Sequence, residues 1–259
     1  MGKTGHPSVE GRTTHTDAGA PSPADAVMPA PGTGRPAAAV TGSLRLAVLV
    51  SGRGSNLQAI LDAISSGRLR ATLAGVFSDR AEAHALERAR HAGVHAQSLS
   101  PKGFSSRAAF DAALFDAVDA VAPDLVVCAG YMRLIAPEVV APRAGTVLNI
   151  HPSLLPAFKG LHTHRQALQA GVAEHGASVH FVTAELDGGP VVAQARVPVR
   201  AGDDEASLAA RVLGREHPLL VATLGLFAQG RVELREGGVH VDGRPLHAPL
   251  QLSCNDAFA

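Results

Sequence analysis

The amino-acid sequence predicts a doubly wound α/β domain whose sheet is mostly parallel. Continuous apolar runs alternate with segments whose apolar residues recur at helical spacing. Such runs are typical of strands buried on both faces, and the alternation implies right-handed β-α-β crossovers. Glycine-rich or polar segments follow several of the runs, at the positions where open α/β sheets bind their ligands.

Three strand–helix pairs are predicted in the first half of the domain. Strands are expected at residues 46–50, 72–77 and 94–99, and helices at 56–65, 81–92 and 107–121. In the first helix, the apolar residues Leu57, Ile60, Leu61 and Ile64 share one face. Gly93 is placed to end the second helix, because glycine readily adopts the left-handed conformation found there.

The second half of the domain adds four strands and a long helix. Strands are expected at residues 125–129, 146–150, 178–183 and 191–199, the last two joined by Asp187-Gly188-Gly189. A short helix is predicted at 165–170, and a long one over 203–228 is expected to cover the sheet. An antiparallel C-terminal extension completes a domain at 44–245, which leaves a C-terminal tail at 246–259.

Residues 1–43 are predicted to form a disordered extension. Residues 1–42 contain six Pro, seven Gly and eight Ala but no Leu, Ile or aromatic residue. Such a segment buries too little apolar surface to offset the entropy that ordering would cost. It also lacks the continuous apolar stretch of a signal peptide.

The composition narrows the functional classes. The 23 basic residues balance the 23 acidic ones, and there is no Trp. Both observations argue against nucleic-acid binding through a basic surface or a stacking platform. No apolar run reaches the ~20 residues of a membrane span. Cys128 and Cys254 are far apart and have neither a disulfide framework nor zinc-ligand spacing.

The turn after the first predicted strand has the composition of an anion-binding loop. It reads Ser51-Gly52-Arg53-Gly54-Ser55-Asn56, and the N–H groups that open a helix favour an anion. Leu57 occupies the third glycine position of a dinucleotide-binding motif, and the lysine of a P-loop is missing. Phosphate binding is preferred over two alternatives, a bare tight turn and a dinucleotide site that uses Asp79.

Asn149 and His151 form a polar pair at the end of the strand predicted at 146–150. Alternate residues of a strand point to one face, and the two prolines that follow stiffen the exit from the strand. The structural interpretation is that His151 only binds backbone groups near a turn. The functional one is a hydrogen bond to Asp187, which would fix the tautomer of His151 and raise its pKa. A turn aspartate also commonly caps its own backbone.

Thirteen histidines raise the question of a metal centre. His162 and His164 are two residues apart before a predicted helix, and His175 and His180 follow. Neither an H-E-x-x-H motif nor a cysteine partner accompanies them. Packing or a role in a substrate loop is therefore preferred over metal binding.

Together, these segments resemble the phosphoribosylglycinamide formyltransferase family. The motifs occur in one order: Ser51-Gly52-x-Gly54-Ser55-Asn56-Leu57, Asn149-Ile150-His151-Pro152-Ser153-Leu154-Leu155-Pro156, Gly160-Leu161-His162-Thr163-His164, Ser178-Val179-His180-Phe181 and Asp187-Gly188-Gly189-Pro190. The resemblance covers roughly residues 44–235 and implies a Rossmann-like formyltransferase fold. The implied reaction transfers the formyl group of 10-formyltetrahydrofolate to the amine of glycinamide ribonucleotide, in de novo purine biosynthesis.

The resemblance also implies roles for individual residues. The catalytic ones would be Asn149, His151 and Asp187, and the ribonucleotide would contact Gly54, Ser55, Asn56 and Glu216. The folate would contact Arg107, Met132, Arg133, Leu134, Ile135, Asn149, Thr183, Leu186 and Asp187. Two residues depart from the pattern: Leu213 stands where a polar contact to the ribonucleotide is expected, and Tyr131 replaces a Phe beside the pterin.

The implied mechanism is direct transfer within a ternary complex. Asn149 and His151 would donate hydrogen bonds to the formyl oxygen as it becomes an oxyanion, and Asp187 would keep His151 protonated. Neither a covalent intermediate nor a metal is required. We expect a cytoplasmic monomer or homodimer that binds its two small-molecule substrates, and neither nucleic acid nor membranes.

Other enzymes with related motifs are the alternatives. The resemblance extends to 10-formyltetrahydrofolate hydrolase, which shares the Asn-x-His…Asp set but normally carries a folded regulatory domain ahead of it. Methionyl-tRNA formyltransferase carries an added C-terminal RNA-binding barrel, for which too few residues follow Arg235. A nicotinamide dehydrogenase or a non-catalytic nucleotide-binding module would use the glycine loop alone and leave Asn149, His151 and Asp187 unexplained.

Overall fold

The computed structural model describes residues 1–2, 42–236 and 238–258. The predicted disorder of residues 1–43 therefore falls almost wholly outside the described residues. The folded domain begins at Leu44.

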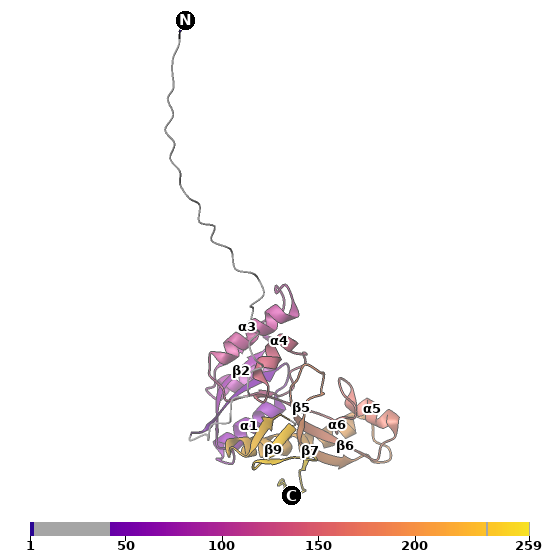
Figure 1. The fold of residues 1–259 in the computed structure, drawn as a ribbon. Helices are drawn as coiled ribbons and strands as arrows, with labels where there is room; N and C mark the ends of the chain where they lie inside the picture. The colour runs from indigo at the N-terminus through magenta and orange to yellow at the C-terminus, as the bar shows by residue number, and fades with distance from the viewer. Residues whose placement is uncertain (3–41, 237, 259) are drawn as a thin grey trace. The chain divides into compact units, whose positions relative to one another are not determined.

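An eight-stranded sheet forms the centre of this domain (Figure 1). Its strands lie in the order β11-β7-β6-β5-β4-β1-β2-β3. Their bounds are β1 Leu44–Val50, β2 Ala71–Ser78, β3 Ala96–Ser98, β4 Leu125–Cys128, β5 Val147–His151, β6 Glu174–Phe181, β7 Val191–Pro198 and β11 Leu250–Gln251. β6 is antiparallel to β5 and β7, whereas the other pairings are parallel. The prediction of a mostly parallel sheet is confirmed.

Helices cover both faces of the sheet. They are α1 Ser55–Ser65, α2 His84–His91, α3 Arg107–Asp119, α4 Pro137–Val140, α5 Thr163–Ala170 and α6 Glu205–Ala228, with a 3-10 turn at Ala141–Arg143. α3 and α4 lie on one side of the sheet, away from α1 (Figure 1). Among the described residues, no helix is both long and apolar enough to cross a bilayer.

The continuous apolar run of β1 follows from its burial on both faces. Leu46 and Val48 point into a core shared with α1, α2 and α6. Ala47 and Leu49 point the other way, into a second core shared with α3 and α4. A strand between two helical layers has no solvated face, and therefore no alternation of apolar and polar residues.

The predicted starts of two elements differ from the observed ones by more than two residues. α2 begins at His84 instead of residue 81, because Ala83 has an extended backbone conformation. β6 begins at Glu174 instead of residue 178, and its buried early residues include His175 and Gly176. Neither residue type is common in strands, so the amino-acid sequence did not indicate this part of β6. The four-residue α4 was not predicted because it is too short to show helical periodicity.

A small antiparallel sheet follows α6, which confirms the expected antiparallel extension. Its strands are β8 Val232–Arg235, β9 Gly238–Val241 and β10 Arg244–Pro245. The segment that we described as a C-terminal tail contributes β11, which pairs with β7 at the edge of the main sheet. Arg215 of α6 also donates a hydrogen bond to the carbonyl of Ser253 at 2.6 Å and forms an ion pair with Asp256 at 2.7 Å.

Two glycine substitutions test the packing of β6 and α6. A Cβ atom at Gly176 would lie 2.0 Å from the carbonyl oxygen of Ala195 on β7, whereas one at Gly225 of α6 would meet nothing within 4 Å. We expect Gly176→Ala to lower the free energy of unfolding by roughly 1–3 kcal/mol, as overpacking does. The control Gly225→Ala should raise it by roughly 0.5–1 kcal/mol through helix propensity. Urea unfolding measures both, and a stable Gly176→Ala variant would contradict the close approach of β6 and β7.

Candidate active site

The antiparallel pair β5–β6 brings the side chains of Asn149, His151 and His180 to one face of the sheet, which also carries Ser178. Asn149 lies directly opposite His180, and His151 lies opposite Ser178. Residues that face each other across an antiparallel pair point to the same side. His151 is 6% exposed and His180 is 2% exposed, so both imidazoles are largely removed from water.

Asp187 lies in the loop between β6 and β7 and approaches all three of these side chains. Its Oδ2 lies 3.6 Å from His151 Nδ1, and its Oδ1 lies 3.6 Å from His180 Nε2. Asn149 Nδ2 donates a long hydrogen bond to Oδ1 at 3.5 Å. The predicted catalytic residues Asn149, His151 and Asp187 are therefore brought together.

The predicted hydrogen bond between His151 and Asp187 is wrong. The 3.6 Å between Nδ1 and Oδ2 is too long for one, although Asp187 is close enough to attract the ring once the ring is protonated. His151 Nε2 instead donates to the carbonyl of Phe158 at 3.0 Å, because a carbonyl can only accept. The neutral ring therefore carries its hydrogen on Nε2.

The predicted rise in the pKa of His151 is wrong as well. Burial lowers this pKa, and it outweighs the hydrogen bond to Phe158 and the charge of Asp187, which both favour the protonated ring. For Asp187 the balance is different. Burial raises its pKa, but His180, the N–H of Gly160 and the charge of His151 lower it by more in total. At neutral pH the site holds a neutral His151 beside an ionised Asp187.

His180 determines how the amide of Asn149 is oriented. Its Nδ1 donates to the carbonyl of Phe181 at 2.9 Å, which leaves Nε2 of the neutral ring as an acceptor. Asn149 Nδ2 donates to that nitrogen at 3.2 Å. Sequence reasoning did not select His180 as a site residue, because its position depends on the register of β5 and β6.

The loop after β5 closes over the site in a constrained conformation. The N–H of Gly160 donates to Asp187 Oδ2 at 2.9 Å, and Lys159 pairs with Glu185 at 2.7 Å. Phe158, His162 and Asp187 all have positive φ angles of 46° to 58°. Such a conformation costs a non-glycine residue on the order of 1–3 kcal/mol, and strain of this kind gathers at functional sites.

The residues expected at the ribonucleotide gather at the start of α1. Gly54 is the N-cap with φ 75°, and a Cβ atom there would lie 2.5 Å from the Cβ of Ala85. Because glycine has no capping side chain, the first N–H groups of α1, from Ser55 onward, are available to an anion. Asn56 Nδ2 donates to Glu216 Oε2 at 2.9 Å, and burial raises the pKa of Glu216.

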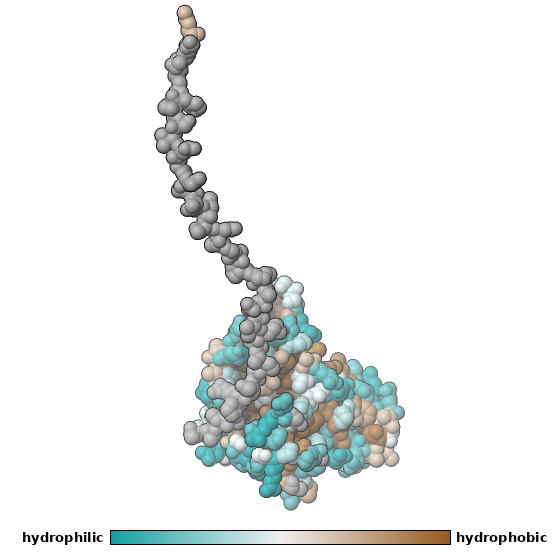
Figure 2. Space-filling view, viewed as in Figure 1, coloured by the Kyte–Doolittle hydropathy of each residue, from teal (hydrophilic) through white to brown (hydrophobic). Residues whose placement is uncertain are grey.

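Several residues expected at the folate expose apolar surface. Met132 is 57% exposed and Leu186 is 49% exposed, and Leu134 is also exposed. Large apolar side chains that lie in water commonly mark a binding surface. Figure 2 shows apolar areas within a largely hydrophilic surface.

The other residues of the folate set have different environments. Ile135 is buried in the core beneath α3, and Arg133 lies over the ring of Phe110 at 5.0 Å. Arg107 is exposed at the start of α3, and Thr183 is half-buried. Neither is among the side chains that contact Asp187.

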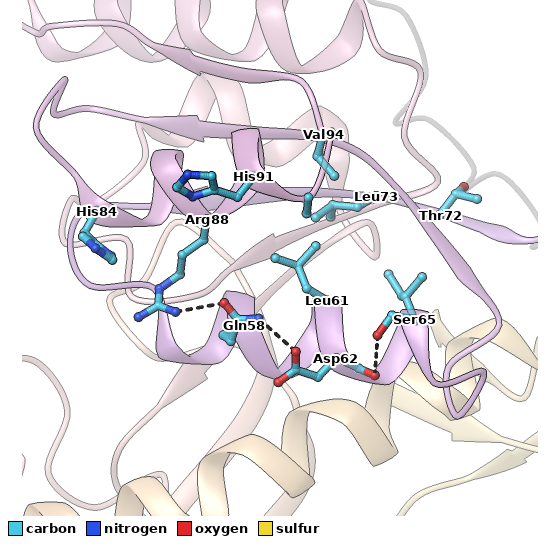
Figure 3. Close-up of a pocket in the computed structure, with 12 residues that line it drawn as sticks. Gln58, Leu61, Asp62, Ser65, Thr72, Leu73, His84, Arg88, His91 and Val94 are labelled. Atoms are coloured by element: carbon cyan, nitrogen blue, oxygen red, sulfur yellow. Dashed lines mark hydrogen bonds between the residues drawn. The ribbon is translucent and has the colours of Figure 1, made fainter.

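One cavity of about 690 Å³ lies between α1 and α2 (Figure 3). It is lined by Leu61, Leu73 and Val94, with Arg88 donating to Gln58 Oε1 at 2.8 Å. None of the predicted catalytic residues lines it. The candidate active site is therefore defined by its converging polar groups and not by this cavity.

Two of the histidines considered for a metal centre form a pair beneath the loop. His164 Nδ1 lies 3.2 Å from His175 Nε2, and the edge of the Phe158 ring packs against His175. In the part of the chain that the structure describes, no group of three or more His, Cys, Asp or Glu side chains is arranged to hold a metal ion.

The sequence is similar to known formyl transferases. The model of the formyl transferase family matches residues 44–224. Phosphoribosylglycinamide formyltransferase of Escherichia coli is 51% identical over 203 residues, which is 78% of this chain and 96% of the relative. The enzyme of the same name from Haemophilus influenzae is 41% identical over 78% of this chain and 95% of its own length.

Solved structures of such proteins share the fold. Glycinamide ribonucleotide transformylase 1 from Symbiobacterium toebii superposes with a TM-score of 0.74 at 49% identity, over 77% of this chain and 94% of that one. Phosphoribosylglycinamide formyltransferase from Coxiella burnetii superposes with a TM-score of 0.76 at 42% identity, over 79% of this chain and 96% of that one.

The buried His175, paired with the half-buried His164, predicts a loss of stability in acid. Burial lowers the pKa of His175 to about 4, and the neighbouring His164 and His151 contribute to this. Between that value and the unfolded pKa of about 6.5, the unfolded chain binds more protons, so the free energy of unfolding falls as the pH falls through this window. Urea unfolding from pH 7 to pH 4 should show a shallower decline for His175→Gln. A control, His240→Gln in the C-terminal sheet, should keep the wild-type slope, and an equally steep His175→Gln profile would contradict the assignment.

Proposed function

The chain belongs to the formyl transferase family, and we propose that it transfers the formyl group of 10-formyltetrahydrofolate to the amine of glycinamide ribonucleotide. The convergence of Asn149, His151 and Asp187 on one face of β5–β6 carries this proposal. The enzymes that share its sequence over nearly their whole length support it. We further propose that the protein acts in the cytoplasm, as a monomer or homodimer, on these two small molecules and without nucleic acid.

The phosphate of the ribonucleotide would bind at Gly54, Ser55 and Asn56. The uncapped start of α1 offers N–H groups, and the positive end of the helix dipole favours an anion there. Glu216 would accept hydrogen bonds from ribose hydroxyl groups. Its distance of 2.9 Å to Asn56 supports a common site for the phosphate and the sugar.

The folate would lie against the exposed apolar side chains that follow β4 and β6. Met132, Leu134 and Leu186 offer apolar surface. Transfer of a planar pterin from water to such a surface is favourable, because it removes apolar surface from water. Arg107, Arg133, Ile135 and Thr183 would complete this site.

Formyl transfer requires that the negative formyl oxygen is stabilised and that a proton moves from the amine to the folate nitrogen. The amine attacks the formyl carbon, whose oxygen becomes negative, and the bond to the folate nitrogen then breaks. Asn149 Nδ2 donates only a weak hydrogen bond to Asp187, at 3.5 Å. It can therefore donate that hydrogen to the formyl oxygen instead, as the oxygen becomes negative. The amine loses a proton, and the folate nitrogen gains one.

His151 is suited to carry that proton. In the neutral ring Nδ1 is free of hydrogen and can accept the proton of the attacking amine. Asp187, 3.6 Å away, then stabilises the imidazolium, which gives the proton to the leaving nitrogen. Asp187 thus supports a charge that forms during the reaction, and it does not hold His151 protonated beforehand.

The requirement for an acceptor amine separates this function from hydrolysis of the folate. We expect 10-formyltetrahydrofolate to be consumed only when glycinamide ribonucleotide is present, with one formylated ribonucleotide formed for each folate released. Absorbance of the folate and mass spectrometry of the ribonucleotide follow the two products. Folate consumption that is independent of the ribonucleotide would indicate the hydrolase instead.

Replacement of His151 tests its part in the chemistry. We expect His151→Ala to lower kcat by about 10²–10⁴, the usual contribution of a general acid–base residue. Ribonucleotide affinity, measured by calorimetry, should survive because Gly54–Asn56 lie elsewhere. His247→Ala, an exposed histidine outside the site, serves as the control. Equal losses of turnover and of ribonucleotide binding would show that His151 is structural.

A further inference from the structure

Three neighbouring strands end close to Ser51. The sheet order places β1 between β4 and β2, and Ser51 directly follows β1. Asp79 directly follows β2, and the segment containing Gly130 and Met132 follows β4. The strand order reverses between β1 and β4, and such a switch point is where doubly wound folds bind ligands.

The Ser51 residue forms hydrogen bonds to both neighbouring segments. Its backbone N–H donates to the carbonyl of Gly130 at 3.1 Å. Its hydroxyl accepts a hydrogen bond from the N–H of Met132 at 3.0 Å and donates one to Asp79 Oδ1 at 2.6 Å. Ser51 is 3% exposed and Asp79 is 7% exposed, so these bonds are shielded from water.

The carboxylate of Asp79 determines the orientation of the hydroxyl. A serine hydroxyl has one hydrogen, and here that hydrogen is directed to a charged acceptor over a short distance. The oxygen lone pairs are then left for the N–H of Met132. In the dinucleotide site that we considered as an alternative to phosphate binding, Asp79 would contact the ligand, whereas in the structure its Oδ1 accepts the hydrogen of Ser51.

Ser51 adjoins both loops that the proposed function assigns to substrates. Gly54–Asn56, the proposed ribonucleotide loop, begins three residues after it, and Met132 begins the proposed folate loop. We propose that the Ser51–Asp79 pair is a positioning device that sets the place of the folate loop relative to the ribonucleotide loop. This inference rests on the proposed function.

The two loops differ in how much they depend on Ser51. The glycine loop is also held from α2, because the N–H of Ala85 donates to the carbonyl of Gly52 at 3.1 Å and Arg88 Nε donates to that of Arg53 at 2.9 Å. In the described structure, the hydrogen bond of the Met132 N–H goes to the Ser51 hydroxyl. Loss of the hydroxyl should therefore loosen the folate loop at Met132, although its ends stay bound at Gly130 and Ala136, and leave the glycine loop in place.

Steady-state kinetics of full-length Ser51→Ala tests this asymmetry. We expect the KM for 10-formyltetrahydrofolate to rise about 3- to 10-fold, as for the loss of one hydrogen bond. The KM for glycinamide ribonucleotide and kcat should stay within about twofold, because neither α1 nor His151 is touched. Asp79→Asn, whose amide oxygen can still accept from Ser51, should retain most of the folate affinity.

A double-mutant cycle separates positioning from general stability. Asp79→Ala should raise the folate KM as Ser51→Ala does, and the double variant should be no worse than the more affected single one. Unchanged folate KM in an active Ser51→Ala enzyme would overturn the inference alone. So would an equal rise in both KM values accompanied by a lower melting temperature. Absence of formyl transfer by the wild-type protein would overturn the proposed function, and this inference with it.

Discussion

The arrangement of the site depends on one buried carboxylate, that of Asp187. Burying a charge costs free energy unless neighbouring groups compensate it, and here the neighbours come from three segments. The N–H of Gly160, in the loop after β5, and the amide of Asn149 on β5 donate hydrogen bonds to the carboxylate. The imidazoles of His151 on β5 and His180 on β6 each lie 3.6 Å from it. The antiparallel β6 is what makes this possible, because its register places His180 opposite Asn149. A single reversed strand in a parallel sheet therefore gathers the polar groups.

The groups around the Asp187 carboxylate lie at unequal distances from it. The N–H of Gly160 is close at 2.9 Å, whereas the two imidazoles and the amide lie at 3.5–3.6 Å. The carboxylate therefore keeps much of its capacity to stabilise a positive charge. The lowered pKa of His151 complements this, since a ring that is neutral at rest is able to take up a proton. Burial lowers the pKa of this imidazole and the charge of Asp187 raises it, and the proposed mechanism depends on the balance between them.

The order of strands and helices was predictable because the spacing of apolar residues along the sequence follows which faces of each element are buried. β1 lies between two cores and reads as a continuous apolar run, and Asn149 and His151 could be placed on one face by their spacing. Contacts that depend on register were not predictable. His180 and the bond between Ser51 and Met132 join segments that are 31 and 81 residues apart. The pKa of His151 was predicted in the wrong direction because the extent of burial is not visible in the sequence.

The pairing of β11 with β7 has a consequence for how the protein can be handled. β7 would otherwise be the outer strand of the main sheet, with free N–H and C=O groups that invite pairing with another molecule. Ser253 and Asp256, which follow β11, bind Arg215, the neighbour of Glu216. A shortened C-terminus would therefore combine a tendency to aggregate with a loosened end of the proposed ribonucleotide site, two defects with no other evident link.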